Sequence, residues 1–258
     1  MFPDRTPDAA TLNAYYENYS RLGRNRPVHS AVPWQKRSAM SVLERLVAEK
    51  PDARVLDVGC HDGGLLQVLP DSLQKYGIDV SEDACRRAAE KGIRARCGSL
   101  FDLDFSEKFD LIVALDVMEH FAQPPAAVRR MAAWMQEDAC LFIQTGNAAS
   151  RPARMLGRDW YYPAIFGHLV VLGDRAMDEM SRKAGLKTEA FANVQHHDSP
   201  FKKRLYGGGL AWGFHLFRAA LRPLDPLGYK LPLLSKIYCH YPFQAPMADH
   251  MIWLGRKK

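Results

Sequence analysis

Residues 55–66, VLDVGCHDGGLL, combine a short apolar run, a glycine-rich turn and the start of a helix. A turn of this kind between a strand and a helix commonly binds a nucleotide. A dinucleotide-binding turn needs glycine at its second position, so that the backbone can approach the pyrophosphate. Counting from Gly59, that position is His61, whose side chain would obstruct the approach. The turn therefore favours a ligand that does not place a phosphate there.

A carboxylate follows this turn at the distance that a ribose-binding acid would have. Asp79 lies 20 residues after Gly59, where a carboxylate at the end of the next strand can accept hydrogen bonds from both ribose hydroxyls. The turn and Asp79 together predict a nucleoside-containing ligand. A nicotinamide-dependent oxidoreductase is disfavoured, because its cofactor would meet His61.

The chain around this turn alternates short apolar runs with helical patterns, which is typical of a parallel α/β sheet covered on both faces. We expect strands at 53–58, 75–80, 93–97, 109–115, 140–145 and 187–194, with 250–257 as a last edge strand. Helices are predicted after Ser81, after Pro124 (with Val128, Met131 and Met135 on its apolar stripe), and from Asp174 to Gly185. The predicted fold is a doubly wound, Rossmann-like, seven-stranded, mostly parallel sheet.

The length of 258 residues suits a single domain with an insertion. We divide it into an N-terminal helical segment (1–50), a ligand-binding core (51–199), a helical insertion (200–245) and the final strand (246–258). The best helical segments of the first part are TLNAYYENYS and SAMSVLERLVAEK.

Composition narrows the setting of the protein. The N-terminus does not resemble a signal peptide, and no long uninterrupted apolar run predicts a membrane span. The five cysteines are odd in number, scattered, and never spaced as C-x-x-C. This pattern argues against a disulfide framework or a zinc-binding cysteine site and favours a reducing cytoplasm.

The insertion carries most of the excess charge. Between 200 and 245 there are seven Lys/Arg and one acid, which matches the net charge of +6 for the whole chain. An amphipathic helix is expected, with Leu210, Phe214, Phe217 and Leu221 on one stripe. Three interpretations stay open: a lid or core element over an acceptor pocket, a contact with a membrane surface or a lipid-linked substrate, or an oligomer contact. A nucleic-acid partner is not expected, the oligomeric state stays open, and the expected location is the cytoplasm, with peripheral contact to the inner membrane face as an alternative.

Four motifs, VLDVGCHDGG, YGIDVS, CGSLFDL and FDLIVALDVMEHF, resemble those of the class I S-adenosylmethionine-dependent methyltransferases, in the same order and at similar spacing. The resemblance covers roughly 37–194 and the last strand. The fourth motif is especially similar to that of the ubiquinone-biosynthesis-type O-methyltransferases. It implies S-adenosyl-L-methionine as cofactor and a small-molecule or lipid-linked acceptor.

Position by position, the resemblance implies a set of cofactor contacts. Asp57, Gly59, Cys60 and Gly63 would surround the methionine part, Asp79 would hold the ribose, and Val80 would lie against the adenine. Ser99, with Leu100, stands where relatives often carry an adenine-contacting Asp. Leu115 would lie beneath the sulfonium, and Arg37 stands near the position of a basic residue for the cofactor carboxylate.

Two histidines are candidate bases for an acceptor hydroxyl. Removal of the hydroxyl proton typically accelerates such transfers by about 10²–10⁴-fold. His120 follows the fourth strand, at the edge where open α/β sheets bind their ligands. His168 lies beside Trp160, Tyr161 and Tyr162, which could wall an acceptor pocket. Structural roles for both histidines remain alternatives.

The segment DVMEH also resembles the Glu-x-x-Glu-His motif that binds a divalent metal in some of these O-methyltransferases. Asp116, Glu119 and His120 would be its ligands. The shorter Asp116 and the missing fourth ligand disfavour a metal, and helix capping by the same residues is the alternative.

Other functions remain open. The methyl group could pass to carbon or nitrogen, although the Asn/Asp-Pro-Pro-aromatic motif of many amino-group methyltransferases is missing. A non-catalytic cofactor-binding partner that regulates another protein is the alternative from a different class.

Overall fold

The computed structural model describes residues 7–8, 11–12, 14–16, 37–157, 160, 162–195 and 248–258. The predicted insertion at 200–245, Tyr161 and half of the predicted first helix (13 and 17–20) lie outside these residues, and so does the side chain of Arg37. Within that first helix, residues 11–12 and 14–16 are helical.

Helices and strands alternate along the described chain, as the sequence predicts. The helices are α2 (Arg37–Ala48), α3 (Gly64–Val68), α4 (Glu82–Glu90), α5 (Pro124–Trp134), α6 (Arg151–Leu156) and α7 (Asp174–Lys183), with 3₁₀ turns η1 (Met118–His120) and η3 (Tyr162–Ala164). The strands are β1 (Arg54–Val58), β2 (Gln74–Asp79), β3 (Arg94–Cys97), β4 (Phe109–Leu115), β5 (Met135–Gly146), β6 (Leu186–Val194) and β7 (His250–Lys257).

The seven strands form one sheet in the order β3-β2-β1-β4-β5-β7-β6. β1 to β5 are parallel to their neighbours, whereas β7 pairs antiparallel with both β5 and β6. The sheet is thus mostly parallel and reverses its strand order beside β1. In such sheets, ligands bind outside the carboxyl ends of the strands at the reversal.

The prediction that residues 250–257 form an edge strand is wrong. β7 lies between β5 and β6, with Ile252 paired to Gln144 on one side and Ala192 on the other. Its first six residues are all buried, because helices and neighbouring strands cover it on both faces and both edges. β6 is the edge strand instead, and most of its residues are exposed.

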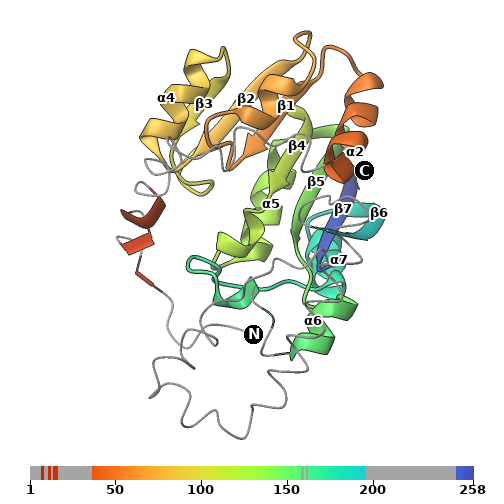
Figure 1. The fold of residues 1–258 in the computed structure, drawn as a ribbon. Helices are drawn as coiled ribbons and strands as arrows, with labels where there is room; N and C mark the ends of the chain where they lie inside the picture. Colours follow the sequence, from red (N-terminus) through yellow and green to blue (C-terminus); the bar gives the residue numbers. More distant parts are fainter. Residues whose placement is uncertain are drawn as a thin grey trace, which may run out of the picture.

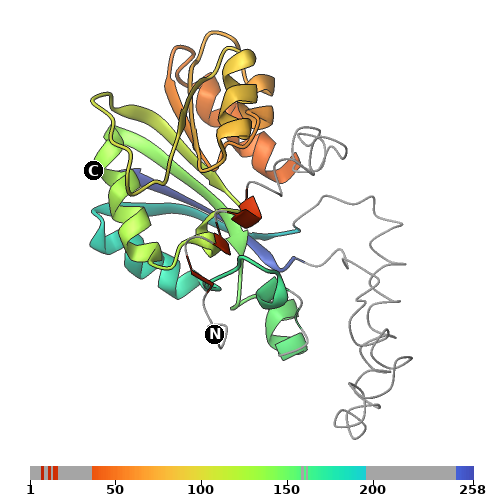
Figure 2. The same ribbon diagram turned by 90° about the vertical axis from the view of Figure 1, so that its left-hand side faces the viewer.

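Two apolar layers enclose the sheet. One contains Leu43 of α2, Leu66 of α3 and Ala88 of α4, packed against strand residues such as Val55. The other layer lies on the opposite face of the sheet and contains side chains of α5 and α7, among them Met177 of α7. Figures 1 and 2 show α2 and α4, in orange and yellow, on the opposite side of the sheet from α5 and α7.

Local signals explain where two helices begin and end. Ser81 caps α4 as predicted, because its hydroxyl accepts a hydrogen bond from the Ala84 amide at 3.3 Å. α5 begins with its two prolines, as predicted, but ends at Trp134. Met135 is therefore the first residue of β5 and not part of the helical stripe.

No helix among the described residues is long and apolar enough to cross a lipid bilayer.

Candidate active site

The glycine-rich turn after β1 is tied to the end of β2. The amides of Gly59 and Cys60 both donate to the carbonyl oxygen of Ile78, at 2.9 and 3.0 Å. Gly59 has φ +78°, and a Cβ there would lie 3.0 Å from the Val117 side chain. Glycine is required at this position because the backbone is left-handed and the turn passes close to the segment after β4.

Asp79 ends β2 and fixes the turn from the other side. Its Oδ2 accepts a hydrogen bond from the His61 amide at 2.9 Å, and its Oδ1 accepts one from the Ser81 amide at 3.0 Å. A carboxylate has about four acceptor positions, so these two bonds orient the group and leave capacity for further donors. The geometry is compatible with the predicted role of Asp79 in holding a ribose.

His61 adopts a left-handed conformation, with φ +48°. This conformation is uncommon for residues other than glycine, although histidine is enriched among the exceptions. What this position requires is therefore a residue that can adopt a left-handed backbone conformation, and not room for a phosphate. The ring lies beside the carboxylate of Asp62, with Nδ1 and Oδ1 3.4 Å apart.

Two predicted cofactor residues contribute to packing. A Cβ on Gly63 would lie 2.1 Å from Cδ1 of Ile93, so this glycine allows the turn to pack against the β3 side of the sheet. The Cys60 side chain is buried against Gly77 of β2. Burial raises the pKa of its thiol, with further contributions from Asp57 and Asp79. Only the backbone of Cys60 is well placed for a ligand in the turn.

The next residues along the edge are partly exposed and apolar. Val80 and Phe101 are 40% and 44% exposed, whereas Leu100 is buried. The Ser99 hydroxyl accepts a hydrogen bond from the Phe101 amide at 3.2 Å and keeps its own proton to donate. These features suit a flat, apolar group such as a purine beside Val80. The remaining predicted contacts are Asp57, buried on β1, and Leu115, half-buried at the end of β4.

A second group of polar side chains gathers where β4 ends. Glu119, in η1, is 1% exposed. Its Oε1 accepts a 2.5 Å hydrogen bond from the Tyr162 hydroxyl, and its Oε2 accepts a 2.8 Å bond from the Thr145 hydroxyl. Burial, followed by the charges of Glu119 and Asp116, raises the pKa of Tyr162, which keeps its phenol protonated as a donor.

His168 lies against this carboxylate. Its Nε2 is 3.9 Å from Oε1 of Glu119, and its Nδ1 is 2.9 Å from the carbonyl oxygen of Tyr162. Burial lowers the pKa of His168 to about 4, and the nearby Glu119 only partly opposes this effect. The neutral form therefore predominates near neutral pH. Because a carbonyl oxygen can only accept, the ring proton is on Nδ1.

His120 has the same tautomer for the same reason. Its Nδ1 lies 2.8 Å from the carbonyl oxygen of Gly167, so this nitrogen carries the proton when the ring is neutral. The Tyr16 hydroxyl is 3.1 Å from the same nitrogen. The rings of His120 and His168 meet edge to face with centroids 5.0 Å apart.

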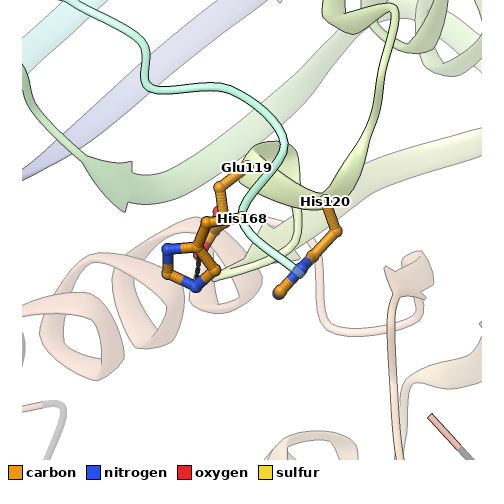
Figure 3. A group of neighbouring side chains, drawn as sticks. All are labelled: Glu119, His120 and His168. Carbon is orange, nitrogen blue, oxygen red and sulfur yellow. Dashed lines mark ion pairs between the residues drawn. The ribbon is translucent and has the colours of Figure 1, made fainter. Parts of the chain in front are cut away.

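Figure 3 shows Glu119 and His168 pointing toward one another, with His120 beside them. One ligand-type atom from each of these three residues lies within 4.8 Å of the others. Asp116, the predicted first metal ligand, is not part of this group. It has φ +51°, and its Oδ1 is 3.4 Å from Nε2 of Gln144. The sequence pattern predicted that Asp116 would lie beside Glu119 and His120, whereas in the structure the third residue of this group is His168.

The described aromatic residues of the segment between α6 and α7 (157–173, the 160s loop) divide into two groups. Trp160 and Tyr162 are almost fully buried and stack at 5.3 Å, with the Trp160 indole donating to Asp249. They support Glu119 from within the protein. Among the described residues of this loop, Phe166 is an exposed aromatic side chain, and it meets Tyr15 edge to face with ring centroids 4.8 Å apart.

Tyr16 connects the two halves of the site. Burial raises its pKa, and the charges of Tyr15, Glu119 and Asp79 raise it further. The hydroxyl therefore lies within electrostatic reach of both the turn carboxylate and the buried one. Sequence reasoning missed Tyr16 and Thr145, because neither belongs to a motif and both reach the site only through the fold.

Proteins similar to this chain include methyltransferases and a cyclase. A family model described as "Methyltransferase domain" matches residues 32–190. The ubiquinone biosynthesis O-methyltransferase of Bradyrhizobium diazoefficiens is 28% identical over 163 residues, which are 56% of this chain and 64% of that protein. The chain thus matches less than two thirds of that relative's length.

Among solved structures, the [4+2]-cyclase SpnF is 21% identical, with a TM-score of 0.64 and coverage of 99% of this chain and 98% of the other. Magnesium protoporphyrin IX methyltransferase from Synechocystis, solved with bound S-adenosylhomocysteine, has 14% identity, a TM-score of 0.62, and coverage of 97% and 100%. These likenesses concern the fold. Together with the family match, they establish that the chain belongs to the methyltransferase domain family and has the fold of the class I S-adenosylmethionine-dependent methyltransferases.

Proposed function

We propose that this methyltransferase transfers the methyl group of S-adenosylmethionine to a hydroxyl oxygen of a small-molecule or lipid-linked acceptor. The observation that carries the choice of oxygen is the pair of buried or half-buried imidazoles beside Glu119, at the carboxyl edge of β4. A hydroxyl must lose its proton during methylation, and this pair lies where the acceptor would meet the cofactor.

The residues of the turn fit the cofactor. The left-handed Gly59 opens the backbone at the strand end, and the oriented Asp79 carboxylate can accept ribose hydroxyls. The exposed face of Val80 offers an apolar surface for the adenine. His61 does not conflict with a cofactor that has no pyrophosphate.

For this reaction, the protein must align the acceptor with the cofactor and remove the proton of the acceptor hydroxyl. S-adenosylmethionine supplies a methyl group already activated on a sulfonium, so the new C–O bond forms as the C–S bond breaks. Holding the acceptor in line can contribute effective molarities of about 10⁵ M or more. The hydroxyl proton can pass to Nε2 of His120 or His168, since the Nδ1 protons point to carbonyl oxygens.

The acceptor is proposed to be at least partly apolar. Tyr15 and Phe166 lie beside Gly167, whose carbonyl oxygen orients His120. An aromatic or prenylated ring that carries a hydroxyl would suit these neighbours. A lipid-linked acceptor would also give the basic insertion at 200–245 a role, as a contact with an anionic membrane surface or as a lid.

Product analysis tests this proposal. The full chain is incubated with methyl-labelled S-adenosylmethionine and a panel of phenols, catechols, amines and carbon acids, and the methylated atom is assigned by mass spectrometry and NMR. Methyl ethers are the expected products. N-methyl or C-methyl products would overturn the choice of oxygen, and cofactor binding without turnover on any acceptor would favour a regulatory partner.

A variant separates proton transfer from cofactor binding. His120→Asn should lower kcat far more than it changes the Kd for S-adenosylmethionine, because the imidazole acts on the acceptor. His61→Asn is the matched control, since it changes a histidine at the cofactor turn. Equal kcat for wild type and His120→Asn would show that this imidazole takes no part.

A further inference from the structure

We propose that Cys85 and Cys97 are a site of reversible oxidation, where a peroxide converts the two thiols to a disulfide that weakens the binding of S-adenosylmethionine. The two side chains lie beside Asp79 and Val80, where the ribose and the adenine of the cofactor are expected. The inference goes beyond the proposed function, because it concerns the cofactor and applies whichever atom of the acceptor is methylated.

The two thiols meet between α4 and β3. Cys85 lies near the start of α4, and Cys97 is the last residue of β3, the outermost strand at that end of the sheet. Their side chains are in hydrogen-bonding contact with each other, and Figure 1 shows α4 beside β3. A disulfide forms without a large backbone movement only where two thiols are already close.

The two sulfurs differ in exposure. Of the four cysteines that the structure describes, Cys97 is exposed, whereas Cys60, Cys85 and Cys140 are buried. Burial, followed by the charges of Asp79 and Cys97, raises the pKa of the Cys85 thiol to about 12, so this thiol is protonated near neutral pH. Redox-sensing cysteines are typically accessible and stand next to a second cysteine that completes the disulfide. Cys97 is therefore expected to react first.

The reaction with hydrogen peroxide has two steps. The Cys97 sulfur attacks one oxygen as the O–O bond breaks, which gives a sulfenic acid, and the other oxygen leaves as water with the thiol proton. The Cys85 sulfur then attacks the Cys97 sulfur, the S–O bond breaks, and the hydroxyl leaves as water with the Cys85 proton. Two thiols and one peroxide thus give one disulfide and two waters, and the two electrons that the sulfurs lose reduce the peroxide. A thiol reductant reverses the change by exchange.

Both thiols support the backbone that carries the proposed cofactor contacts. The Cys85 thiol donates to the carbonyl oxygen of Asp79 at 3.5 Å, and the Cys97 thiol donates to that of Val80 at 3.6 Å. Both donors are lost when the sulfurs join. The sulfurs must also approach to about 2.05 Å, well inside their contact distance as thiols, so α4 and β3 must shift relative to one another.

Backbone hydrogen bonds carry such a shift to the Asp79 carboxylate. The Cys85 amide donates to the carbonyl oxygen of Ser81 at 3.0 Å, and the Ser81 amide donates to Oδ1 of Asp79 at 3.0 Å. On the other side, Asp79 pairs with Cys97 in the sheet, and the Gly98 amide donates to its carbonyl oxygen at 2.8 Å. Both cysteines are thus linked to Asp79, so the disulfide is expected to move its carboxylate away from the position that suits a ribose.

Peptide mapping tests the site. The full chain is reduced, freed of reductant and treated with hydrogen peroxide, and the remaining thiols are alkylated before digestion and mass spectrometry without reductant. A peptide pair linked through Cys85 and Cys97 is expected, and dithiothreitol should abolish it. A link from Cys97 to Cys239, or oxidation of Cys97 to a sulfinic acid with no linked pair, would overturn the proposal.

Calorimetry tests the coupling to the cofactor. The oxidised protein should bind S-adenosylmethionine about 10-fold more weakly than the reduced protein, as expected for the loss of one well-formed hydrogen bond to the ligand, and dithiothreitol should restore the affinity. Because the coupling is reciprocal, saturating cofactor should raise the reduction potential of the pair, by about 30 mV for a 10-fold effect. An unchanged Kd in protein that carries the disulfide would overturn the coupling.

Variants assign the effect to this pair. Cys97→Ser removes the exposed sulfur but keeps a hydroxyl that can donate to Val80. Its Kd should lie within about threefold of wild type before peroxide treatment and should stay there afterwards. Cys85→Ala should be equally insensitive to peroxide; if this buried variant does not fold, Cys97→Ser decides alone.

Cys140→Ser is the matched control, because it removes a buried cysteine from β5, which is not next to β3 in the sheet. This variant should still form the linked peptide and lose affinity as wild type does. An equal loss of affinity after peroxide in wild type and Cys97→Ser would overturn the proposal, since oxidation elsewhere, such as at a methionine, would then be the cause.

Discussion

Asp79 has two tasks at the edge of the sheet. Its oxygens accept hydrogen bonds from the amides of His61 and Ser81, so it joins the glycine-rich turn to the start of α4. The predicted ribose would use the remaining acceptor positions of the same carboxylate. A substitution at this residue therefore affects both the ligand and the loop that receives it.

We predict that Asp79→Asn weakens S-adenosylmethionine binding by about 1–3 kcal/mol, because the amide nitrogen replaces one acceptor with a donor. Isothermal titration calorimetry measures the change. Asp110→Asn is the control, since Asp110 also accepts a hydrogen bond from a backbone amide, that of Arg54 at 2.8 Å. Asp110 lies near the amino end of β4, away from the carboxyl ends of the strands where Asp79 lies. An affinity within threefold of wild type for Asp79→Asn would contradict the ribose assignment.

His250 provides a pH-dependent contribution to stability. It is fully buried, and its Nδ1 lies 2.8 Å from Oδ1 of Asp249. Burial alone would lower its pKa, but the hydrogen bond to Asp249 and the charges of Asp116, Asp249 and Glu119 raise it above the usual value. The folded state therefore binds this proton more tightly than the unfolded state does, and the resulting stability is complete below the unfolded pKa near 6.5.

We predict that this contribution is lost as the pH rises through the raised pKa of His250. The free energy of unfolding, measured with urea, should differ between wild type and Asp249→Asn by more at pH 6 than at pH 9. Asp249→Asn removes the charge that favours the imidazolium and keeps an acceptor for the Trp160 indole. The same difference at both pH values would show that His250 does not titrate in this range.

Motifs predicted the position of the candidate cofactor residues at the sheet edge, but they did not predict which polar residues gather around Glu119. Gly59 and Asp79 follow from local rules, because a strand end and a turn set both positions. The pairing of His168 with Glu119 depends on how the 160s loop returns to the sheet, 49 residues later in the chain. The motif DVMEH therefore suggested Asp116, whose left-handed backbone and contact with Gln144 set it apart from Glu119 and His120.

At the scale of elements, the positions of the strands along the sequence were predictable, but the place of β7 in the order of the sheet was not. The six strands between 53 and 194 were expected within a few residues, except that β5 begins earlier, at Met135. The order of β6 and β7 depends on which strand inserts beside β5, and sequence order does not state this. The continuous apolar run Met251–Leu254 was the available signal, because it is buried on both faces, as an interior strand requires.

Packing of α7 on the sheet gives a test at this scale. Met177 is fully buried between α7 and the sheet, whereas Met155 of α6 is 49% exposed. We predict that Met177→Ala lowers the free energy of unfolding by about 2–5 kcal/mol, through lost burial and the cavity left behind. Met155→Ala should change it by less than about 0.5 kcal/mol. Comparable urea midpoints for the two variants would contradict this placement of α7.

Across the whole molecule, the candidate site residues lie at the carboxyl edge of the parallel strands, and the excess positive charge lies in the segment 200–245. The turn after β1, Asp79 and the group around Glu119 all follow the carboxyl ends of parallel strands, with Tyr16 within electrostatic reach of both carboxylates. The net charge of +6 equals the excess of seven Lys/Arg over one acid at 200–245. That segment lies outside the described residues, so its role is predicted from sequence alone.

We predict that the full chain cosediments with anionic lipid vesicles at low salt. Each aromatic side chain buried in the interface contributes about 1.5–3 kcal/mol, and each Lys or Arg near an anionic surface adds about 1 kcal/mol. High salt should weaken binding by screening, and the double variant Phe214→Asp/Phe217→Asp should abolish it. Phe191→Asp is the control, because Phe191 is an exposed aromatic residue on β6, outside the insertion.

A wild-type protein that stays in the supernatant at low salt would contradict the membrane contact and favour the lid. The same double variant would then weaken acceptor binding, measured as a raised KM for the acceptor, while the Kd for S-adenosylmethionine stays unchanged. The two interpretations differ in what the aromatic stripe contacts, since a lid buries it against the acceptor and an interfacial helix buries it in lipid. If the double variant does not fold, the stripe packs against the protein's own core, and the basic residues alone are left to face a partner.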